Sequence, residues 1–149
     1  MKPIRNSIKA VIVQNGALLL IKKMSEAGSY FIFPGGGQKK YEDMLAALKR
    51  ECQEEIGVDI VIRDLLWVRE YIGKNHEFAA TDGKTHQIEF YFSCRLVDGS
   101  VPKNGSQMDD GQVSVEWVPL SDLSKTNVYP LSLRREFVTP SRVYFGDRN

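Results

Sequence analysis

The sequence predicts an α/β fold in which a mixed β-sheet is packed with helices as a sandwich. Two observations lead to this prediction. Runs rich in β-branched and aromatic residues both precede and follow one helical segment, residues 43–56, and a second helical segment comes only late in the chain. Strands that do not alternate one by one with helices do not build a doubly wound parallel sheet. With 149 residues the chain has the size of one domain with one core, so we expect a single domain over residues 1–149.

The segment before the helix is predicted to contain three strands. Residues 7–13 are rich in β-branched side chains, and the Asn15-Gly16 dipeptide is typical of the type I′ turn in a β-hairpin. Residues 17–22 then form the partner strand. Residues 30–33 form a short aromatic strand that stops before a proline, because proline has no backbone N–H to donate to a sheet.

Residues 43–56 have the periodicity of an amphipathic helix, and Gly57 follows as a residue typical of helix C-caps. Apolar side chains recur at i, i+3, i+7 and i+11 and so form one stripe: Leu45, Leu48, Cys52 and Ile56. We expect this stripe to pack against the sheet.

The second half of the chain is predicted to be mainly β-structure. We expect four strands there, at residues 58–62, 65–71, 86–96 and 113–118. Loops are expected at residues 75–84 and 97–111, which contain Asp-Gly and Asn-Gly turns. Two short helices are expected at residues 120–123, with Ser121 as the N-cap, and at residues 130–137.

Composition excludes several classes of function. The net charge is +1, so no large field of one sign draws the chain to nucleic acid or to an anionic membrane. The apolar run near the N-terminus is too short for a signal peptide or a membrane span. Only two cysteines are present, Cys52 and Cys94, which is no disulfide framework. A reducing, cytoplasmic setting is therefore expected.

Three glutamates near the end of the predicted helix share one face. Glu51, Glu54 and Glu55 are related as i, i+3 and i+4. Two like charges about 6 Å apart repel by roughly 3 kcal/mol at an effective dielectric near 20, but by only about a few tenths of a kcal/mol in water. Two interpretations follow: a solvated helix face, or a site where carboxylates converge on a divalent cation such as Mg²⁺.

The glycines at positions 35–37 are open to the same two kinds of explanation. Without side chains they let the backbone approach closely, so that a carbonyl could turn toward the cation. A tight connection between a strand and the helix would need them as well.

The spacing of these residues is specific. Gly36, then five residues, Glu42, then seven residues, and then RECQEEIGV over residues 50–58 resembles the Nudix box, G-x5-E-x7-R-E-U-x-E-E-x-G-U, where U is bulky and apolar. All seven fixed positions match, and a chance match in a chain of this length is on the order of one in a million. Cys52 at a U position and Tyr41, where glycine is usual, are departures. The chain is similar to the MutT-like Nudix hydrolases over residues 7–125, and the tail, residues 126–149, is not covered.

The resemblance implies a Nudix-type α/β/α sandwich with a mixed sheet. It also implies hydrolysis of a phosphoanhydride bond with Mg²⁺ or Mn²⁺ as cofactor. The metal ligands implied are the Gly36 carbonyl, Glu51, Glu54 and Glu55, and the general base is Glu51 or Glu54. Arg50 matches the arginine that orients these carboxylates, and Glu42 matches its structural partner.

Residues outside these positions are weaker candidates for binding substrate. Lys39 and Lys40 could hold outer phosphates, and Phe31 could stack on a base. Glu89, Asp110 and the neighbouring Asp109 could supply a base or a further ligand. For each of them a solvated or structural role explains the residue equally well.

The sequence therefore predicts a pyrophosphohydrolase acting on a nucleoside diphosphate linked to another moiety, such as a nucleoside triphosphate, ADP-ribose or a nucleotide sugar. The alternative is a non-catalytic Nudix-like domain that senses nucleotides or binds a partner, and the intact glutamates argue against it. RNA-end processing has little support from the near-neutral charge. The sequence leaves open which substrate is cleaved and whether the chain is a homodimer.

Overall fold

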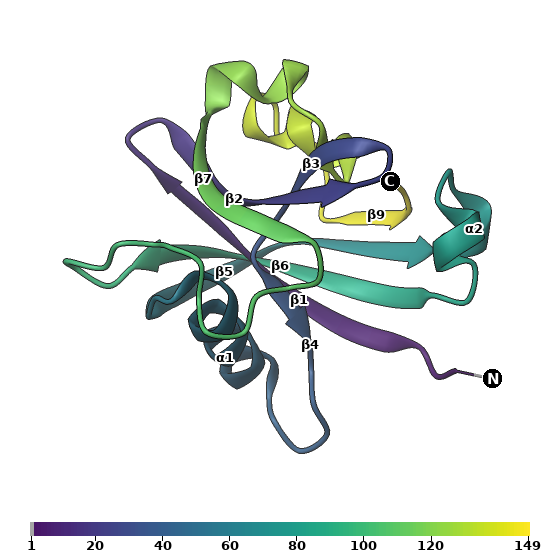
Figure 1. Cartoon of the computed structure of the whole chain (residues 1–149), viewed down its shortest axis with the longest axis horizontal. Coiled ribbons are helices and arrows are strands. Elements are labelled where there is room, and N and C mark those ends of the chain that lie inside the picture. The colour runs from purple at the N-terminus through teal and green to yellow at the C-terminus, as the bar shows by residue number, and fades with distance from the viewer. Residues whose placement is uncertain (1) are drawn as a thin grey trace.

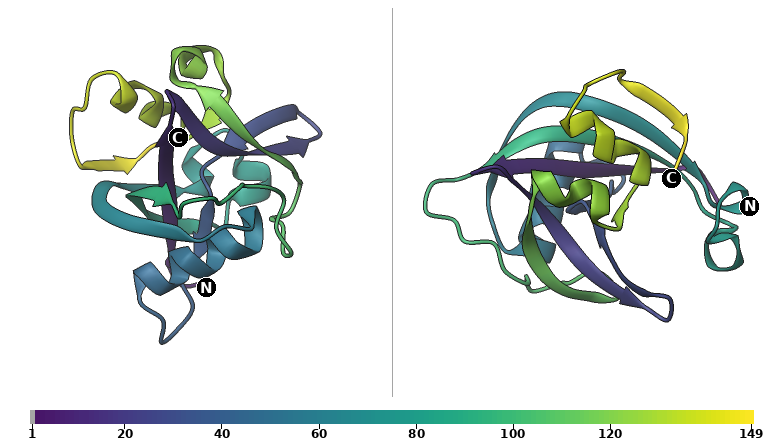
Figure 2. Two further views of the ribbon diagram at one scale, coloured as in Figure 1. Left: turned by 90° about the vertical axis from the view of Figure 1, so that its left-hand side faces the viewer. Right: turned by 90° about the horizontal axis from the view of Figure 1, so that it is seen from above.

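The strands form one curled, mixed β-sheet with helices on both sides (Figures 1 and 2). The structure is a computed structural model that describes residues 2–149. The strands are β1 (Arg5–Gln14), β2 (Ala17–Ser25), β3 (Gly28–Ile32), β4 (Gly35–Gly37), β5 (Ile60–Ile72), β6 (His86–Leu96), β7 (Gln112–Pro119), β8 (Val128–Tyr129) and β9 (Tyr144–Asp147). The helices are α1 (Met44–Ile56), η1 (Gly73–Asn75), α2 (Ala79–Asp82), η2 (Leu120–Lys125) and η3 (Leu131–Phe137), where η denotes a 3₁₀ helix.

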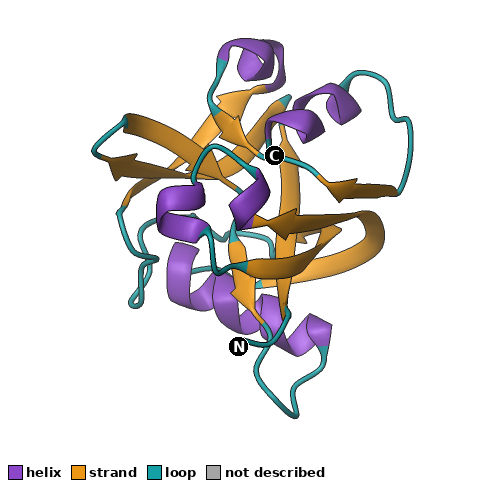
Figure 3. Ribbon diagram, turned by 90° about the vertical axis from the view of Figure 1, so that its right-hand side faces the viewer, coloured by secondary structure: helices purple, strands orange, loops and turns teal. Residues whose placement is uncertain are grey.

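The sheet follows the order β8-β3-β2-β1-β6-β5-β9, while β4 pairs with β1 and β7 pairs with β2. The pairs β1–β6, β3–β8 and β5–β9 are parallel, and the other pairs are antiparallel. Helix α1 lies along one side of the curl, and η2 and η3 lie at its other end (Figures 1 and 3). The predicted α/β class with a mixed sheet is thus confirmed.

The two central strands β1 and β2 are buried on both faces. On β1, Ile8 and Ile12 point into the core under α1, whereas Val11 points into a second core that includes side chains from η2 and η3. This alternation explains why both strands read as nearly continuous apolar runs. The hairpin between them has the predicted turn, since Asn15 and Gly16 have φ values of 53° and 74°.

The helical stripe is confirmed for three of its four residues. Leu48, Cys52 and Ile56 are fully buried, but Leu45 is 45% exposed and its assignment to the stripe was wrong. Leu45 belongs to the first turn of α1, and its neighbour Met44 packs against the core instead.

Some element boundaries differ from the sequence predictions. The glycine run is a strand, β4, rather than a turn, because it pairs with residues of β1. The two strands expected at residues 58–62 and 65–71 are one strand, β5. Its pairing with β6 shifts in register at the polar residues between the two expected strands. Ser121 does not cap η2, whose first residue follows Pro119 without a side-chain cap. The expected loop at residues 75–84 contains α2.

The tail closes onto the edge of the sheet. Strand β9 pairs in parallel with β5, and Asp147 accepts hydrogen bonds from the backbone N–H of Ile72 at 2.9 Å and from Asn75 at 2.8 Å. His76 Nε2 lies 2.6 Å from the same carboxylate. Over residues 2–149, every helix is too short or too polar to cross a membrane.

Candidate active site

Helix α1 fixes the positions of the three predicted carboxylates. It begins after Asp43, whose side chain accepts a hydrogen bond from the Ala46 N–H at 2.8 Å. It ends at Gly57, which has the left-handed φ of 66° and donates to the Gln53 carbonyl at 3.2 Å. The carboxylates therefore lie in the last two turns, where the negative end of the helix dipole adds to their mutual repulsion.

A loop between β6 and β7 covers this end of the helix. Backbone N–H groups of Lys103, Gly105 and Gln107 donate to the carbonyls of Ile56, Glu55 and Glu54 at 3.0, 3.0 and 2.9 Å. The last carbonyls of a helix have no partner within the helix, so the loop satisfies them and holds the carboxylate-bearing turn in place. The sequence identified this segment only as a loop.

Gly105 is the tightest point of this contact, because a Cβ there would lie 2.2 Å from the Glu54 carbonyl oxygen. We expect Gly105→Ala to lower the free energy of unfolding by about 2 kcal/mol, since backbone must move to admit the methyl group. Urea denaturation measures this loss. The exposed neighbour Ser106 provides the control variant Ser106→Ala, and equal stability of the two variants would show that the loop yields freely.

Arg50 joins the acidic side chains of the site. Its Nη2 and Nε donate to the two carboxylate oxygens of Glu42 at 2.6 and 3.1 Å. Its Nη1 donates to Glu51 at 3.0 Å and to Glu54 at 3.3 Å, and Nη2 also reaches the Gly37 carbonyl at 3.0 Å. The bond to Arg50 holds the pKa of Glu42 at about 2. One planar guanidinium thus fixes the side chains on both sides of it.

Gly36 leaves the space that Glu51 occupies. A Cβ on Gly36 would lie 2.5 Å from the carboxyl carbon of Glu51. Gly36 pairs with Ile8 of β1, so it lies on the side of the sheet that faces α1. Any side chain at this position would displace the Glu51 carboxylate.

Glu55 is the most unusual member of the group. It is 4% exposed, and its Oε2 is buried without a hydrogen-bond partner. Burial raises the pKa of this carboxyl from 4.5 to about 9, the nearby Lys9 opposes the rise, and Glu51 adds to it. A buried carboxylate oxygen without a partner is costly, and a divalent cation would give it one. The donor set of this site therefore fits a hard divalent ion.

The three carboxylates are not arranged as a set of metal ligands in this structure. Across residues 2–149 no three His, Cys, Asp or Glu side chains converge on a common point. Arg50 holds Glu51 and Glu54 in the arrangement described above.

The other predicted residues lie in different surroundings. Glu89 is 3% exposed and accepts bonds from Nε and Nη2 of Arg69 at 2.9 and 2.7 Å, as well as from Gln87 and Tyr91. The ion pair with Arg69 explains why a carboxylate can be buried at this position of β6. Phe31 is partly buried against the second core, the one that includes side chains from η2 and η3.

The exposed candidates are found in two loops. Asp110 is exposed, and its neighbour Asp109 accepts a bond from Lys23 Nζ at 2.9 Å. Lys39 and Lys40 are exposed in the loop before α1. In that loop Tyr41 is 94% exposed and takes a left-handed φ of 75°, so it keeps the backbone geometry that glycine adopts most easily.

Lys9 was not identified from the sequence. It is half-buried on β1, its Nζ donates to the Phe33 carbonyl at 3.5 Å, and its charge lowers the pKa of both Glu55 and Glu89 against the effect of burial. A lysine inside the apolar run of residues 8–13 was the signal that could have revealed it.

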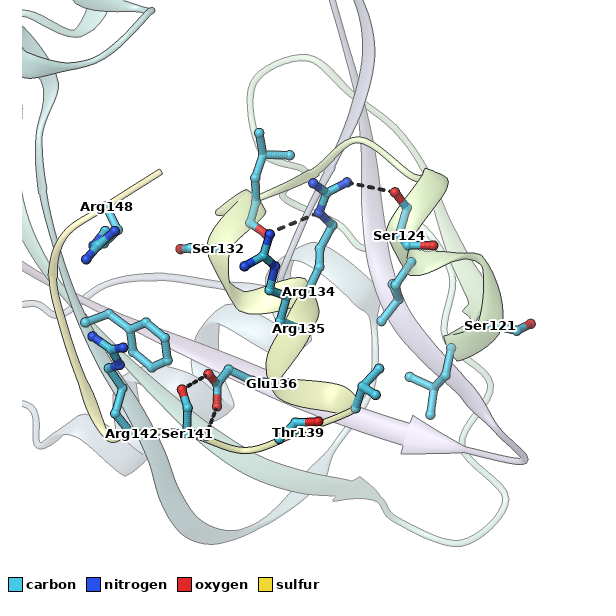
Figure 4. A pocket seen from close by; sticks show the side chains of 15 residues that line it. Ser121, Ser124, Ser132, Arg134, Arg135, Glu136, Thr139, Ser141, Arg142 and Arg148 are labelled. Carbon is cyan, nitrogen blue, oxygen red and sulfur yellow. Dashed lines mark hydrogen bonds between the residues drawn. The ribbon is translucent and has the colours of Figure 1, made fainter.

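A cavity of about 1040 Å³ lies elsewhere in the molecule (Figure 4). Segments η2, η3 and the tail line it with four arginines: Arg134, Arg135, Arg142 and Arg148. Its acidic residue, Glu136, is bonded to Ser141. None of the predicted site residues lines this cavity, so we place the candidate active site at α1, where the carboxylates and Arg50 meet.

Comparison with known proteins gives a family match over most of the chain. The NUDIX domain family matches residues 3–137. Nucleoside triphosphatase NudI of Enterobacter sp. (strain 638) is 30% identical over 135 residues, which is 81% of this chain and 89% of that protein. The human protein nucleoside diphosphate-linked moiety X motif 6 is 30% identical over 118 residues, which is 78% of this chain but only 34% of that protein.

Solved structures show the same fold. A MutT NUDIX hydrolase from Burkholderia pseudomallei superposes with a TM-score of 0.72 at 25% identity, covering 93% of this chain and all of that one. A NUDIX hydrolase from Nitrosomonas europaea gives a TM-score of 0.73 at 20% identity, covering 95% and 93%.

Proposed function

The chain belongs to the Nudix hydrolase family, and from this premise we propose that it is a metal-dependent hydrolase of a nucleoside diphosphate linked to another moiety. The bond cleaved is a phosphoanhydride, and the cofactor is Mg²⁺ or Mn²⁺. Nudix hydrolases generally use a divalent metal. The observation that carries the proposal is Glu55, a buried carboxylate whose Oε2 has no hydrogen-bond partner. It lies beside Glu51, whose carboxylate is bonded to Arg50.

We assign the metal ligands to the Gly36 carbonyl and to Glu51, Glu54 and Glu55. When bound, the ion neutralises charge on phosphate oxygens and activates a water. Glu54 is the better candidate for accepting the proton of the attacking water, because its side chain is 25% exposed whereas that of Glu51 is 14% exposed. Arg50 keeps both carboxylates in place during the reaction.

Several further features of the chain are consistent with this proposal. We propose a single domain over residues 1–149, because β9 in the tail completes the sheet that carries the site. A cytoplasmic location is supported by Cys52 and Cys94, which are free and buried. This chain matches only 34% of the human relative, so activities of that whole protein are not transferred to this chain.

A substrate panel tests the proposal. Nucleoside triphosphates, ADP-ribose and nucleotide sugars are incubated with Mg²⁺ or Mn²⁺, and both products of cleavage are identified. We expect one class to be cleaved at a phosphoanhydride bond and no cleavage in EDTA. Tight binding of a nucleotide without any cleavage in either metal would instead support a non-catalytic, nucleotide-sensing domain.

The raised pKa of Glu55 predicts a pH-dependent stability in the absence of metal. A carboxyl whose pKa rises on folding stabilises the folded state while it is protonated, so its contribution is full below pH 4.5 and is lost as the pH rises toward about 9. In EDTA at pH 8, Glu55→Gln should therefore melt about 3 °C above the wild type, and at pH 4.5 the two should melt together.

Thermal melts with and without Mg²⁺ separate the effect of Glu55 ionisation from the effect of metal binding. Mg²⁺ should raise the melting temperature of the wild type more than that of Glu55→Gln. The exposed Glu26 provides the control Glu26→Gln, which should follow the wild type throughout. If the wild type melted above Glu55→Gln in EDTA at pH 8, the raised pKa of Glu55 and its assignment as a metal ligand would be contradicted.

A further inference from the structure

The second cavity, about 620 Å³, lies beside the glycine run and is rich in positive charge. It is formed by the start of β1, the loop between β4 and α1, and the residues that precede and begin β6. Five cationic side chains line it, and we call it the basic pocket: Lys2, Arg5, Lys39, Lys40 and Lys84. The whole chain has a net charge of only +1, so this is a local concentration of charge.

The positive charge of the basic pocket is not neutralised by the protein. Within residues 2–149, none of its five cations has a carboxylate within 4.0 Å. The one acidic side chain in its lining is Glu42, and both oxygens of Glu42 are bonded to Arg50. Like charges gathered around a hollow attract a multivalent anion.

The glycine run connects the basic pocket to the proposed metal site. A Cβ on Gly37 would lie 2.5 Å from Nε of Arg5, just as a Cβ on Gly36 would lie 2.5 Å from the carboxyl carbon of Glu51. Successive residues of a strand face opposite sides of the sheet, so Arg5 and Glu51 lie on the two sides of β4, at most roughly 12 Å apart. Arg50 bridges them further, because it bonds both to the Gly37 carbonyl and to Glu51.

We propose that the basic pocket binds phosphate groups of the moiety linked to the nucleoside diphosphate. The inference rests on the proposed function and adds a substrate preference to it. Substrates whose linked moiety carries phosphate, such as nucleoside triphosphates, are favoured over those with an uncharged sugar. Arg5 supplies a planar fork for phosphate oxygens, and Lys39 and Lys84 supply mobile point charges.

Binding of inorganic tripolyphosphate in EDTA tests the pocket without catalysis. We expect the double variant Lys39→Gln/Lys84→Gln to bind it about tenfold more weakly than the wild type, as measured by calorimetry at low salt. The matched control removes the same charge from the arginine-lined cavity of Figure 4, as Arg135→Gln/Arg142→Gln, and should bind like the wild type. Equal binding by wild type and pocket variant, or a loss confined to the control, overturns the proposal.

Kinetics then test the substrate preference. With Mg²⁺, the pocket variant should lose about tenfold in kcat/KM on a nucleoside triphosphate and less than about twofold on the diphosphate sugar of the same nucleoside. Equal losses on both substrates would show that the lysines only support the loop. A wild type that cleaves no compound of the panel refutes the proposed function, while the tripolyphosphate measurement still decides whether the pocket binds phosphate.

Discussion

Replacing Glu54 by glutamine is expected to lower kcat by about 100-fold or more while the fold stays intact. Glutamine has the shape of glutamate but cannot accept a proton from water and is a poorer ligand for a hard cation. The Glu54 side chain is 25% exposed and makes one ion pair, with Arg50 at 3.3 Å, so its loss should disturb the structure little. Steady-state kinetics on the best substrate of the panel measure the effect.

The same variant separates the roles of the site and of the basic pocket. Its melting temperature in EDTA should stay close to that of the wild type, and it should still bind tripolyphosphate normally. Glu26→Gln, which alters an exposed turn, serves as the control. Wild-type turnover by Glu54→Gln with Mg²⁺ would remove Glu54 from the proposed mechanism.

Replacing Arg50 by lysine is expected to lower both activity and stability. Lysine keeps the charge, but it cannot replace the fork that bonds Glu42 through two nitrogens and also reaches Glu51, Glu54 and the Gly37 carbonyl. We expect kcat/KM to fall about 100-fold, because the carboxylates lose their fixed positions. The free energy of unfolding should fall by about 2 kcal/mol, because half-buried acceptors are left without donors.

Urea denaturation and kinetics on one preparation measure both effects. Arg95→Lys is a suitable control, because Arg95 is half exposed and its carboxylate partner Asp98 lies 3.8 Å away. A double-mutant cycle with Glu42→Gln isolates the bidentate pair. Unchanged stability together with unchanged activity would show that the contacts of Arg50 are not needed.

Local features of the sequence were predicted well. The spacing from Gly36 to Val58 indicated the family, and the periodicity of residues 43–56 indicated α1. The periodicity depends on neighbours three, four and seven positions apart, whose relative positions a helix fixes by its own geometry. The bond from Arg50 to Glu54, four residues later, is likewise an interaction between neighbours on one helix.

The glycine run shows where such prediction ended. The sequence allowed either a turn or a backbone that approaches a ligand, and the structure shows a strand. It is a strand because Gly36 pairs with Ile8, 28 residues earlier in the chain. No local pattern around the glycines contains that information.

The sequence by itself determined the family, the helix and the face on which Glu51, Glu54 and Glu55 project. Only the tertiary structure decided that Glu55 is buried with an oxygen lacking a partner, that Lys9 lies near it, and that Arg5 lies against Gly37. Burial and charge at these points arise from segments brought together by the register of the sheet. Register is set by pairing between distant strands, so the electrostatics of the site are a property of the folded chain.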